Sequence, residues 1–205
     1  MLLDFINKNY QNGEPILLEE IKYKNKDALR QEMKRLTDNG DLIRVYNGVY
    51  YKPYKTIFNT TGKMSIDKYI DKKFLYKDNS QIGFISGLSL ANKYGFTTQV
   101  PSQIEITSNN ASTKQRKLNI EGRDLIIYSP VVNINSENIS SIQFLDLMQN
   151  IDRYSEISNE ELKSKLKDFI TKTKVDFEIV KKIIVFYPDK VYRNIYNGGL
   201  MNELV

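Results

Sequence analysis

A helical pattern that closes on glycine and leads straight into a short hairpin constrains this fold more than any other stretch of the chain. It occupies residues 35–53 and predicts a helix ending at Gly40, followed by strands over residues 42–46 and 49–52. The Asn47-Gly48 pair between the strands predicts a type I′ turn, because both central residues of that turn need positive φ. A helix that runs directly into a hairpin is how a winged helix-turn-helix ends, with the helix in a DNA groove and the hairpin beside the backbone.

Three helical patterns come before this hairpin. Apolar residues at helical spacing predict a first helix that starts near Leu2 and stops before Gly13. Pro15 predicts the first turn of a short second helix that reaches Ile21. Asn25 is the expected N-cap of a third helix, over residues 26–39, whose apolar face consists of Leu29, Met33 and Leu36.

The rest of the chain predicts a second, mixed domain. Residues 54–62 are typical of a linker. After them the patterns predict helices, a strand, a hairpin around Glu121-Gly122 and a helical end, over residues 66–74, 82–94, 104–107, 117–128 and 140 onward. The predicted fold class is α+β. An N-terminal winged helix-turn-helix (residues 1–55) precedes a mixed α/β C-terminal domain (residues 64–205) that ends in a helical segment.

The candidate DNA-binding residues are basic or amide side chains on the predicted helix and hairpins. Lys26, Arg30 and Lys34 share one helix face, where they could neutralise phosphates. An ordinary solvated face is the alternative, and basic residues near a second hairpin also protect an exposed strand edge. The complete candidate set is Lys24, Lys26, Arg30, Gln31, Lys34, Arg35, Arg44, Asn47, Lys114, Arg116 and Lys117.

Composition argues against an enzyme. The chain has no Cys and no His, so it lacks thiolate metal ligands, the commonest general base and the commonest transition-metal ligand. It has no glycine-rich phosphate loop and no ordered carboxylate set for a metal-dependent nuclease. We expect no catalytic activity, no cofactor and no metal site. Without a signal-peptide pattern or a long apolar run, we expect a cytoplasmic protein that makes no membrane contact.

Three stretches, in this order, resemble the AbiEi family of antitoxins from bacterial type IV toxin–antitoxin abortive-infection systems. Residues 36–53 resemble the end of the family's winged helix, with its Gly-Val-Tyr-Tyr core. Residues 83–101 resemble its helix followed by a Thr-Gln-x-Pro signature, here Gly-Phe-Thr-Thr-Gln-Val-Pro. Residues 104–107 (Ile-Glu-Ile-Thr) and the basic hairpin after them resemble its next strand and hairpin.

The resemblance implies a two-domain antitoxin and autorepressor. The winged helix would bind inverted repeats in its own promoter, and the C-terminal domain would antagonise a nucleotidyltransferase toxin, without needing direct contact. No active-site residue transfers. The net charge is only +5, so we expect cooperative binding at paired sites by a chain that can be monomeric in solution. The alternative is a protein-interaction or general transcription-regulator module with a winged helix and no antitoxin role.

Overall fold

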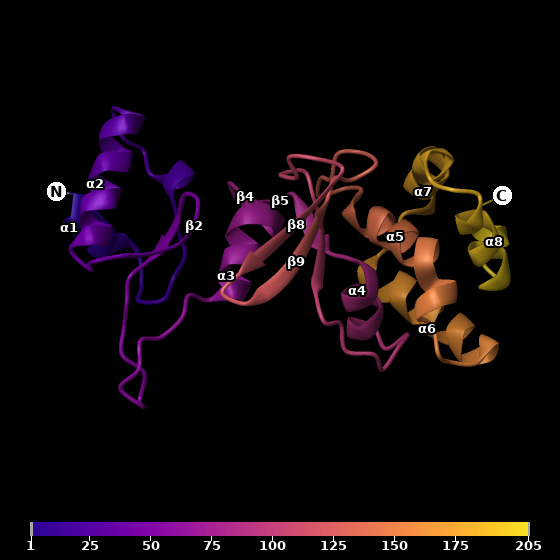
Figure 1. Cartoon of the computed structure of the whole chain (residues 1–205). Coiled ribbons are helices and arrows are strands. Elements are labelled where there is room, and N and C mark those ends of the chain that lie inside the picture. Colours follow the sequence, from indigo (N-terminus) through magenta and orange to yellow (C-terminus); the bar gives the residue numbers. More distant parts are fainter. Residues whose placement is uncertain (1, 205) are drawn as a thin grey trace. The chain divides into compact units, whose positions relative to one another are not determined.

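A computed structural model describes residues 2–204 and shows a mixed α+β protein (Figure 1). The chain divides into two compact units. The first runs to Lys73 and takes in Asn119–Arg123, and the second comprises Phe74–Leu118 and the chain from Asp124 onward. Within residues 2–204, the structure has no helix with the length and hydrophobicity needed to span a bilayer.

The first unit begins with helices and a small antiparallel sheet. In chain order its elements are α1 (Leu2–Asn9), β1 (Ile16–Leu17), the 3-10 helix η1 (Leu18–Glu20), α2 (Lys26–Asp38), β2 (Ile43–Tyr46) and β3 (Val49–Tyr51). The three strands form a sheet in the order β1-β3-β2. Helix α1 and helix α2 are therefore confirmed close to their predicted bounds.

The predicted helix after Pro15 is wrong. Ile16 and Leu17 are buried and pair with Tyr50 and Val49 of β3, so this segment is a strand that leads into a single 3-10 turn. Pairing with a strand far away in the sequence satisfies the backbone groups and buries both apolar side chains. Those long-range contacts outweigh the local preference for a helix.

Helix α2 has the cap and the buried face that its sequence predicts. The Asn25 side chain accepts hydrogen bonds from the N–H groups of Asp27 and Ala28 at 2.8 and 3.2 Å. Its apolar residues Leu29, Met33 and Leu36 are completely or almost completely buried. They share one core with Leu2 and Ile6 of α1, Ile16 of β1 and Tyr50 of β3. This packing leaves the opposite face of α2 open to solvent.

The turn between β2 and β3 lies where expected but is not of type I′. Gly48 has φ +73°, whereas Asn47 is not among the residues with positive φ. The register shifts between Arg44 and Tyr46, so one extra residue bulges from β2 just before the turn. The bulge adds local twist, and the turn therefore needs only one residue with positive φ.

Residues 54–62 form a closed turn rather than an open linker. The N–H of Gly62 donates to the Tyr54 carbonyl at 2.8 Å, and Lys55 bridges to Thr61. The Tyr54 ring covers Gly62 so closely that a Cβ there would lie 2.2 Å from the ring. The turn is consequently held by its own side chains.

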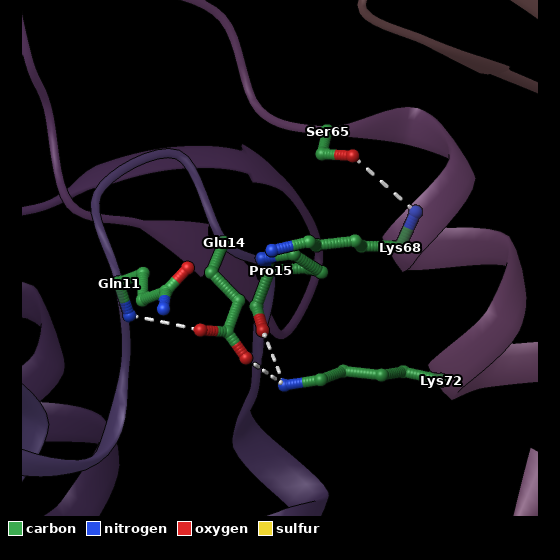
Figure 2. Close-up of polar contacts among 6 residues, drawn as sticks. All are labelled: Gln11, Glu14, Pro15, Ser65, Lys68 and Lys72. Carbon is green, nitrogen blue, oxygen red and sulfur yellow. Dashed lines mark hydrogen bonds and ion pairs between the residues drawn. The ribbon is translucent and has the colours of Figure 1, made fainter.

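Helix α3 (Ile66–Ile70) and the π-helical turn η2 (Asp71–Leu75) follow this turn. Figure 2 shows how they are tied to the loop before β1. Lys72 Nζ donates to Glu14 Oε1 at 2.7 Å and to the Pro15 carbonyl at 3.3 Å, and Glu14 Oε2 accepts from the Gln11 N–H at 2.8 Å. Helix α3 and the start of η2 belong to the first unit, although their sequence lies beyond the predicted linker.

A four-stranded sheet in the order β6-β7-β9-β8 belongs to the second unit, apart from the tip of the β8–β9 hairpin at Asn119–Arg123. Its strands are β6 (Gly83–Ile85), β7 (Ile104–Ser108), β8 (Gln115–Ile120) and β9 (Arg123–Tyr128), and a small hairpin of β4 (Tyr76–Lys77) and β5 (Ser80–Gln81) precedes them. Strand β7 is antiparallel to β6 and parallel to β9. Strand β7 and the β8–β9 hairpin are confirmed, with Glu121 and Gly122 both at positive φ in the hairpin turn.

The predicted helix over residues 82–94 is correct only in its second half. Residues 83–85 form β6, because they pair along β7, and the helix α4 (Gly87–Lys93) starts after them. A Cβ at Gly83 would lie 2.2 Å from the Phe74 carbonyl oxygen, so the glycine permits close approach of another backbone segment.

The C-terminal part is helical, as predicted. Its helices are α5 (Ile139–Tyr154), α6 (Asn159–Thr173), α7 (Phe177–Ile183) and α8 (Lys190–Asn197), with 3-10 turns η3 (Ile184–Phe186) and η4 (Met201–Leu204). They share a core with α4, in which Phe144, Met148 and Phe169 are buried. The buried Asn194 side chain donates to the Met148 carbonyl at 2.8 Å and so joins α8 to α5.

Candidate nucleic-acid interface

The exposed face of α2 carries five of the eleven predicted DNA-binding residues, namely Lys26, Arg30, Gln31, Lys34 and Arg35. Because Leu29 and Met33 anchor the opposite face in the core, Lys26, Arg30 and Lys34 project from the helix at successive turns. All eight candidates of the first unit are exposed: Lys24, Lys26, Arg30, Gln31, Lys34, Arg35, Arg44 and Asn47. The structure thus groups them in one unit, on α2, the bend before it and the hairpin after it.

Acidic neighbours partly compensate the charge of this face. Arg30 Nη1 lies 2.8 Å from Asp27 Oδ1, but both side chains are mostly exposed, at 63% and 82%. Such a surface pair contributes little stability, so a phosphate can replace the carboxylate at small cost. Glu32 is half-buried, and its Oε1 accepts a hydrogen bond from the Tyr23 hydroxyl at 2.7 Å. This bond engages the Glu32 carboxylate with Tyr23 instead of with the basic side chains.

On the hairpin, the two predicted contact residues bind each other. Arg44 Nη2 donates to Asn47 Oδ1 at 3.0 Å, and Arg44 Nε donates to the Tyr46 carbonyl at 3.4 Å. These bonds lay the guanidinium along the turn and use only part of its N–H donors. The remaining donors suit a phosphate oxygen.

The other three candidates belong to the second unit. Lys114 precedes β8, while Arg116 and Lys117 lie on β8, and all three are exposed. Strand β8 forms an edge of its sheet, so the second interpretation, protection of that edge by charge, still applies to Arg116 and Lys117.

The Thr-Gln-x-Pro signature has a structural role that its sequence did not reveal. Glu156, just beyond α5, accepts hydrogen bonds from the hydroxyls of Thr97 and Thr98, the Thr98 N–H and the Gln99 amide, at 2.8 to 3.1 Å. Led by the bond from Gln99, these donors lower the pKa of Glu156 to about 2. The signature therefore joins the loop after α4 to the end of α5, and no local pattern indicates this distant partner.

Two apolar side chains at the turn over residues 54–62 were also missed. Ile57 and Phe58 are 94% and 81% exposed. The sequence of residues 54–62 predicts a linker but does not indicate that its apolar residues lie outside the core. Paired exposed apolar residues are a feature of contact surfaces.

Within the described part of the chain, no three Asp or Glu residues gather closely enough to hold a metal ion. The polar groups of the first unit can form hydrogen bonds and ion pairs with an anionic partner. Arg, Lys and amide side chains supply these interactions, as they do in proteins that bind phosphate groups.

Comparison with known proteins places the chain in a family. Residues 3–179 match a family described as a family of unknown function (DUF6088). The chain belongs to this family. The match includes α2, the β2–β3 and β8–β9 hairpins and the loop that binds Glu156, so all the candidate residues lie within the shared region. No curated protein matches the chain.

Proposed function

We propose that this chain is an antitoxin and transcriptional autorepressor of a type IV toxin–antitoxin operon. The observation that carries the DNA-binding half is the exposed basic face of α2, anchored in the core immediately before the β2–β3 hairpin. The order helix, strand, short helix, helix and hairpin, with β1 paired to β3, supports a winged helix-turn-helix. In this arrangement η1 takes the place of the second helix of the motif.

In this proposal α2 lies in a major groove. Lys26 and Lys34 neutralise phosphates, whereas Arg30 and Gln31 reach base edges, where Arg pairs with guanine and Gln with adenine. The hairpin places Arg44 against the backbone or the minor groove beside it. The unit is small and mildly charged, so two copies bind cooperatively at inverted repeats in the promoter.

The antitoxin half rests on the resemblance of residues 36–107 to the AbiEi family. The second unit antagonises a nucleotidyltransferase toxin, and this does not require a stable complex. The protein acts in the cytoplasm as a binding protein, without catalysis or a cofactor of its own.

A DNA titration tests the first half. Binding of the full chain to the DNA upstream of its own gene is measured by fluorescence anisotropy at several salt concentrations, for the wild type and for Arg30→Ala/Lys34→Ala. We expect the variant to bind more than about tenfold more weakly. We also expect its salt slope to fall by about two, because each neutralised phosphate contributes about 0.9.

A charge-matched control separates a specific face from net charge. Lys167→Ala/Lys182→Ala removes two exposed charges from α6 and α7 and should leave the affinity nearly unchanged. Equal affinity and slope in all three proteins would reject α2 as the reading helix.

For the antitoxin half, the chain is expressed together with the nucleotidyltransferase-type protein encoded beside it. Growth should recover with the wild type and with Arg30→Ala/Lys34→Ala, and continued growth arrest would contradict the proposal.

The alternative function, a protein-interaction module with a winged helix, is favoured by the exposure of Ile57 and Phe58. Absence of any DNA complex at moderate salt, combined with loss of a protein partner on Ile57→Ser/Phe58→Ser, would replace our proposal with this one.

A further inference from the structure

The second unit contains a cavity of about 710 Å³ that none of the DNA-binding residues except Lys114 lines. Its wall is formed by the start of α4, by β7 and β9 and by one face of α5. This volume lies in the usual range for small-molecule sites.

Two carboxylates lie side by side in the cavity wall. Asp146 Oδ2 accepts the Gly87 N–H at 3.1 Å, and Glu105 accepts the Leu88 N–H and the Tyr128 hydroxyl. Gly87 makes this arrangement possible, because a Cβ there would lie 2.5 Å from a Glu105 carboxylate oxygen. Asp146 uses one of its two oxygens in this bond and keeps the other for a further donor.

A buried hydroxyl in the same wall points independently to a ligand. Ser86 lines the cavity and is 1% exposed, yet its Oγ forms no hydrogen bond with any residue that the structure describes. Leaving a buried hydroxyl unpaired costs about 1–3 kcal/mol. The Ser86 Oγ has almost no accessible surface, so a polar ligand would satisfy it only after a small shift of the cavity wall.

Cationic and aromatic groups complete the lining. Arg153 and Lys114 are exposed side chains at the cavity, and the rings of Tyr128 and Tyr154 also line it. Asp146 and Arg153 are seven residues apart on α5, which is nearly two turns, so they share a face at a separation on the order of 10 Å along the axis. A ligand that meets both must therefore be elongated, with donors at one end and an anion at the other.

We propose that this cavity binds a guanine nucleotide. The guanine edge presents adjacent N1–H and amino donors. Asp146 can accept both, one at the free Oδ1 and one at the Oδ2 lone pair that the Gly87 N–H leaves unused. Adenine would place its N1 acceptor against the same carboxylate, so it fits less well. The phosphate would lie against Arg153 and Lys114, and a tyrosine ring offers a surface for base stacking.

The protonation state of Asp146 is consistent with this choice. Burial is the main cause that raises the pKa of Asp146 to about 6, and the negative charge of Glu105 raises it further. The hydrogen bond from the Gly87 N–H lowers this pKa in part. Above about pH 7 this side chain is thus mainly an acceptor. Guanine binding should weaken as the pH falls through about 6, because the protonated carboxyl loses one acceptor site.

Isothermal titration calorimetry of the full chain with guanosine 5′-monophosphate tests the proposal. We expect a Kd on the order of 10 μM for this probe and at least about tenfold weaker binding of adenosine 5′-monophosphate. Asp146→Asn and Arg153→Ala should each weaken guanosine monophosphate binding at least about tenfold. The exposed residue Glu160 on α6 provides a control, and Glu160→Gln should bind like the wild type.

Several outcomes would overturn the proposal. These are no binding of guanosine monophosphate, equal binding of the two nucleotides, or unchanged affinity in a folded Asp146→Asn protein. Because Arg153 is exposed, its replacement keeps the test valid if Asp146→Asn fails to fold. Free L-arginine carries a similar fork of donors, and its binding in place of the nucleotide would assign the cavity to a guanidinium instead.

Discussion

Arg44 and Asn47 are bonded to each other across the tip of the first hairpin, with Nη2 and Oδ1 3.0 Å apart. Both belong to the candidate DNA-binding set that the sequence predicts. If the chain binds DNA as proposed, this bond predicts a division of roles, in which Asn47 orients Arg44 and Arg44 contacts a phosphate.

Replacing these two residues should therefore have unequal effects. Arg44→Ala should weaken DNA binding about three- to tenfold, uniformly across DNA sequences, and lower the salt slope by about one. Asn47→Ala should cause a smaller loss and leave the salt slope unchanged, since the cation remains. Anisotropy titrations on the promoter fragment and on a scrambled fragment measure both. A larger effect from Asn47→Ala would reverse the assignment.

The carboxylate of Glu156 should make stability depend on pH in the acidic range. Hydrogen bonds from Gln99, Thr98 and Thr97 lower its pKa to about 2, below its usual value of about 4.3. A depressed folded-state pKa stabilises the fold fully above the unfolded-state value, and this stabilisation is lost as the pH falls toward 2. Glu156→Gln should lower the urea midpoint near neutral pH and flatten its decline between about pH 4.5 and 2.

For this variant, the exposed Glu137 offers a control, because Glu137→Gln should keep the wild-type pH profile. Identical profiles for Glu156→Gln and the wild type would show that the loop donors do not favour the charged carboxylate.

The Lys72–Glu14 pair should contribute to the stability of the first unit. The side chains are only 30% and 16% exposed, and Lys72 Nζ also lies 4.9 Å from the centre of the Tyr10 ring. Burial raises the pKa of Glu14, but the bonds from the Gln11 N–H and from Lys72 outweigh it and hold the pKa below its usual range. Lys72→Met should cost about 1–2 kcal/mol of unfolding free energy.

A double-mutant cycle isolates the interaction. Combining Lys72→Met with Glu14→Gln should reveal a coupling of about 1 kcal/mol in urea unfolding. Strictly additive single effects would mean that Lys72 acts only through the Pro15 carbonyl and the Tyr10 ring.

Gly87→Ala should destabilise the second unit more than a glycine replacement in an open turn. Gly87 has φ +59°, and its new Cβ would meet the Glu105 carboxylate at 2.5 Å. Gly122 has φ +80° with nothing within 4 Å of an added Cβ, so Gly122→Ala reports backbone strain alone. We expect a cost of about 1 kcal/mol for Gly122→Ala and about 2–3 kcal/mol for Gly87→Ala. Equal costs would show that the carboxylate moves aside freely.

Local chemistry explains what could be predicted. The cap at Asn25 and the spacing of Leu29, Met33 and Leu36 lie within one helix, and the bounds of α2 agree with them to one residue. The Glu121-Gly122 turn between two strand patterns is similarly local, and both residues take positive φ.

The failures have a common physical origin. Residues 16–17 and 83–85 carry helix-compatible patterns, yet they are strands because β3 and β7 supply partners for their backbone groups. The bulge beside Arg44 changed the turn type in the same way, since register is decided by both strands together.

The sequence by itself determined the basic face of α2, the position of its hairpin, the second hairpin and the helical end of the chain. These depend on residues within a few positions of one another, where capping, periodicity and turn chemistry act. Only the tertiary structure decided that Arg44 is held by Asn47, that Glu156 binds the Thr-Gln loop and that Asp146 and Glu105 share a cavity with Ser86. The last two arrangements join residues far apart in the chain, and all three depend on distances that no sequence pattern records.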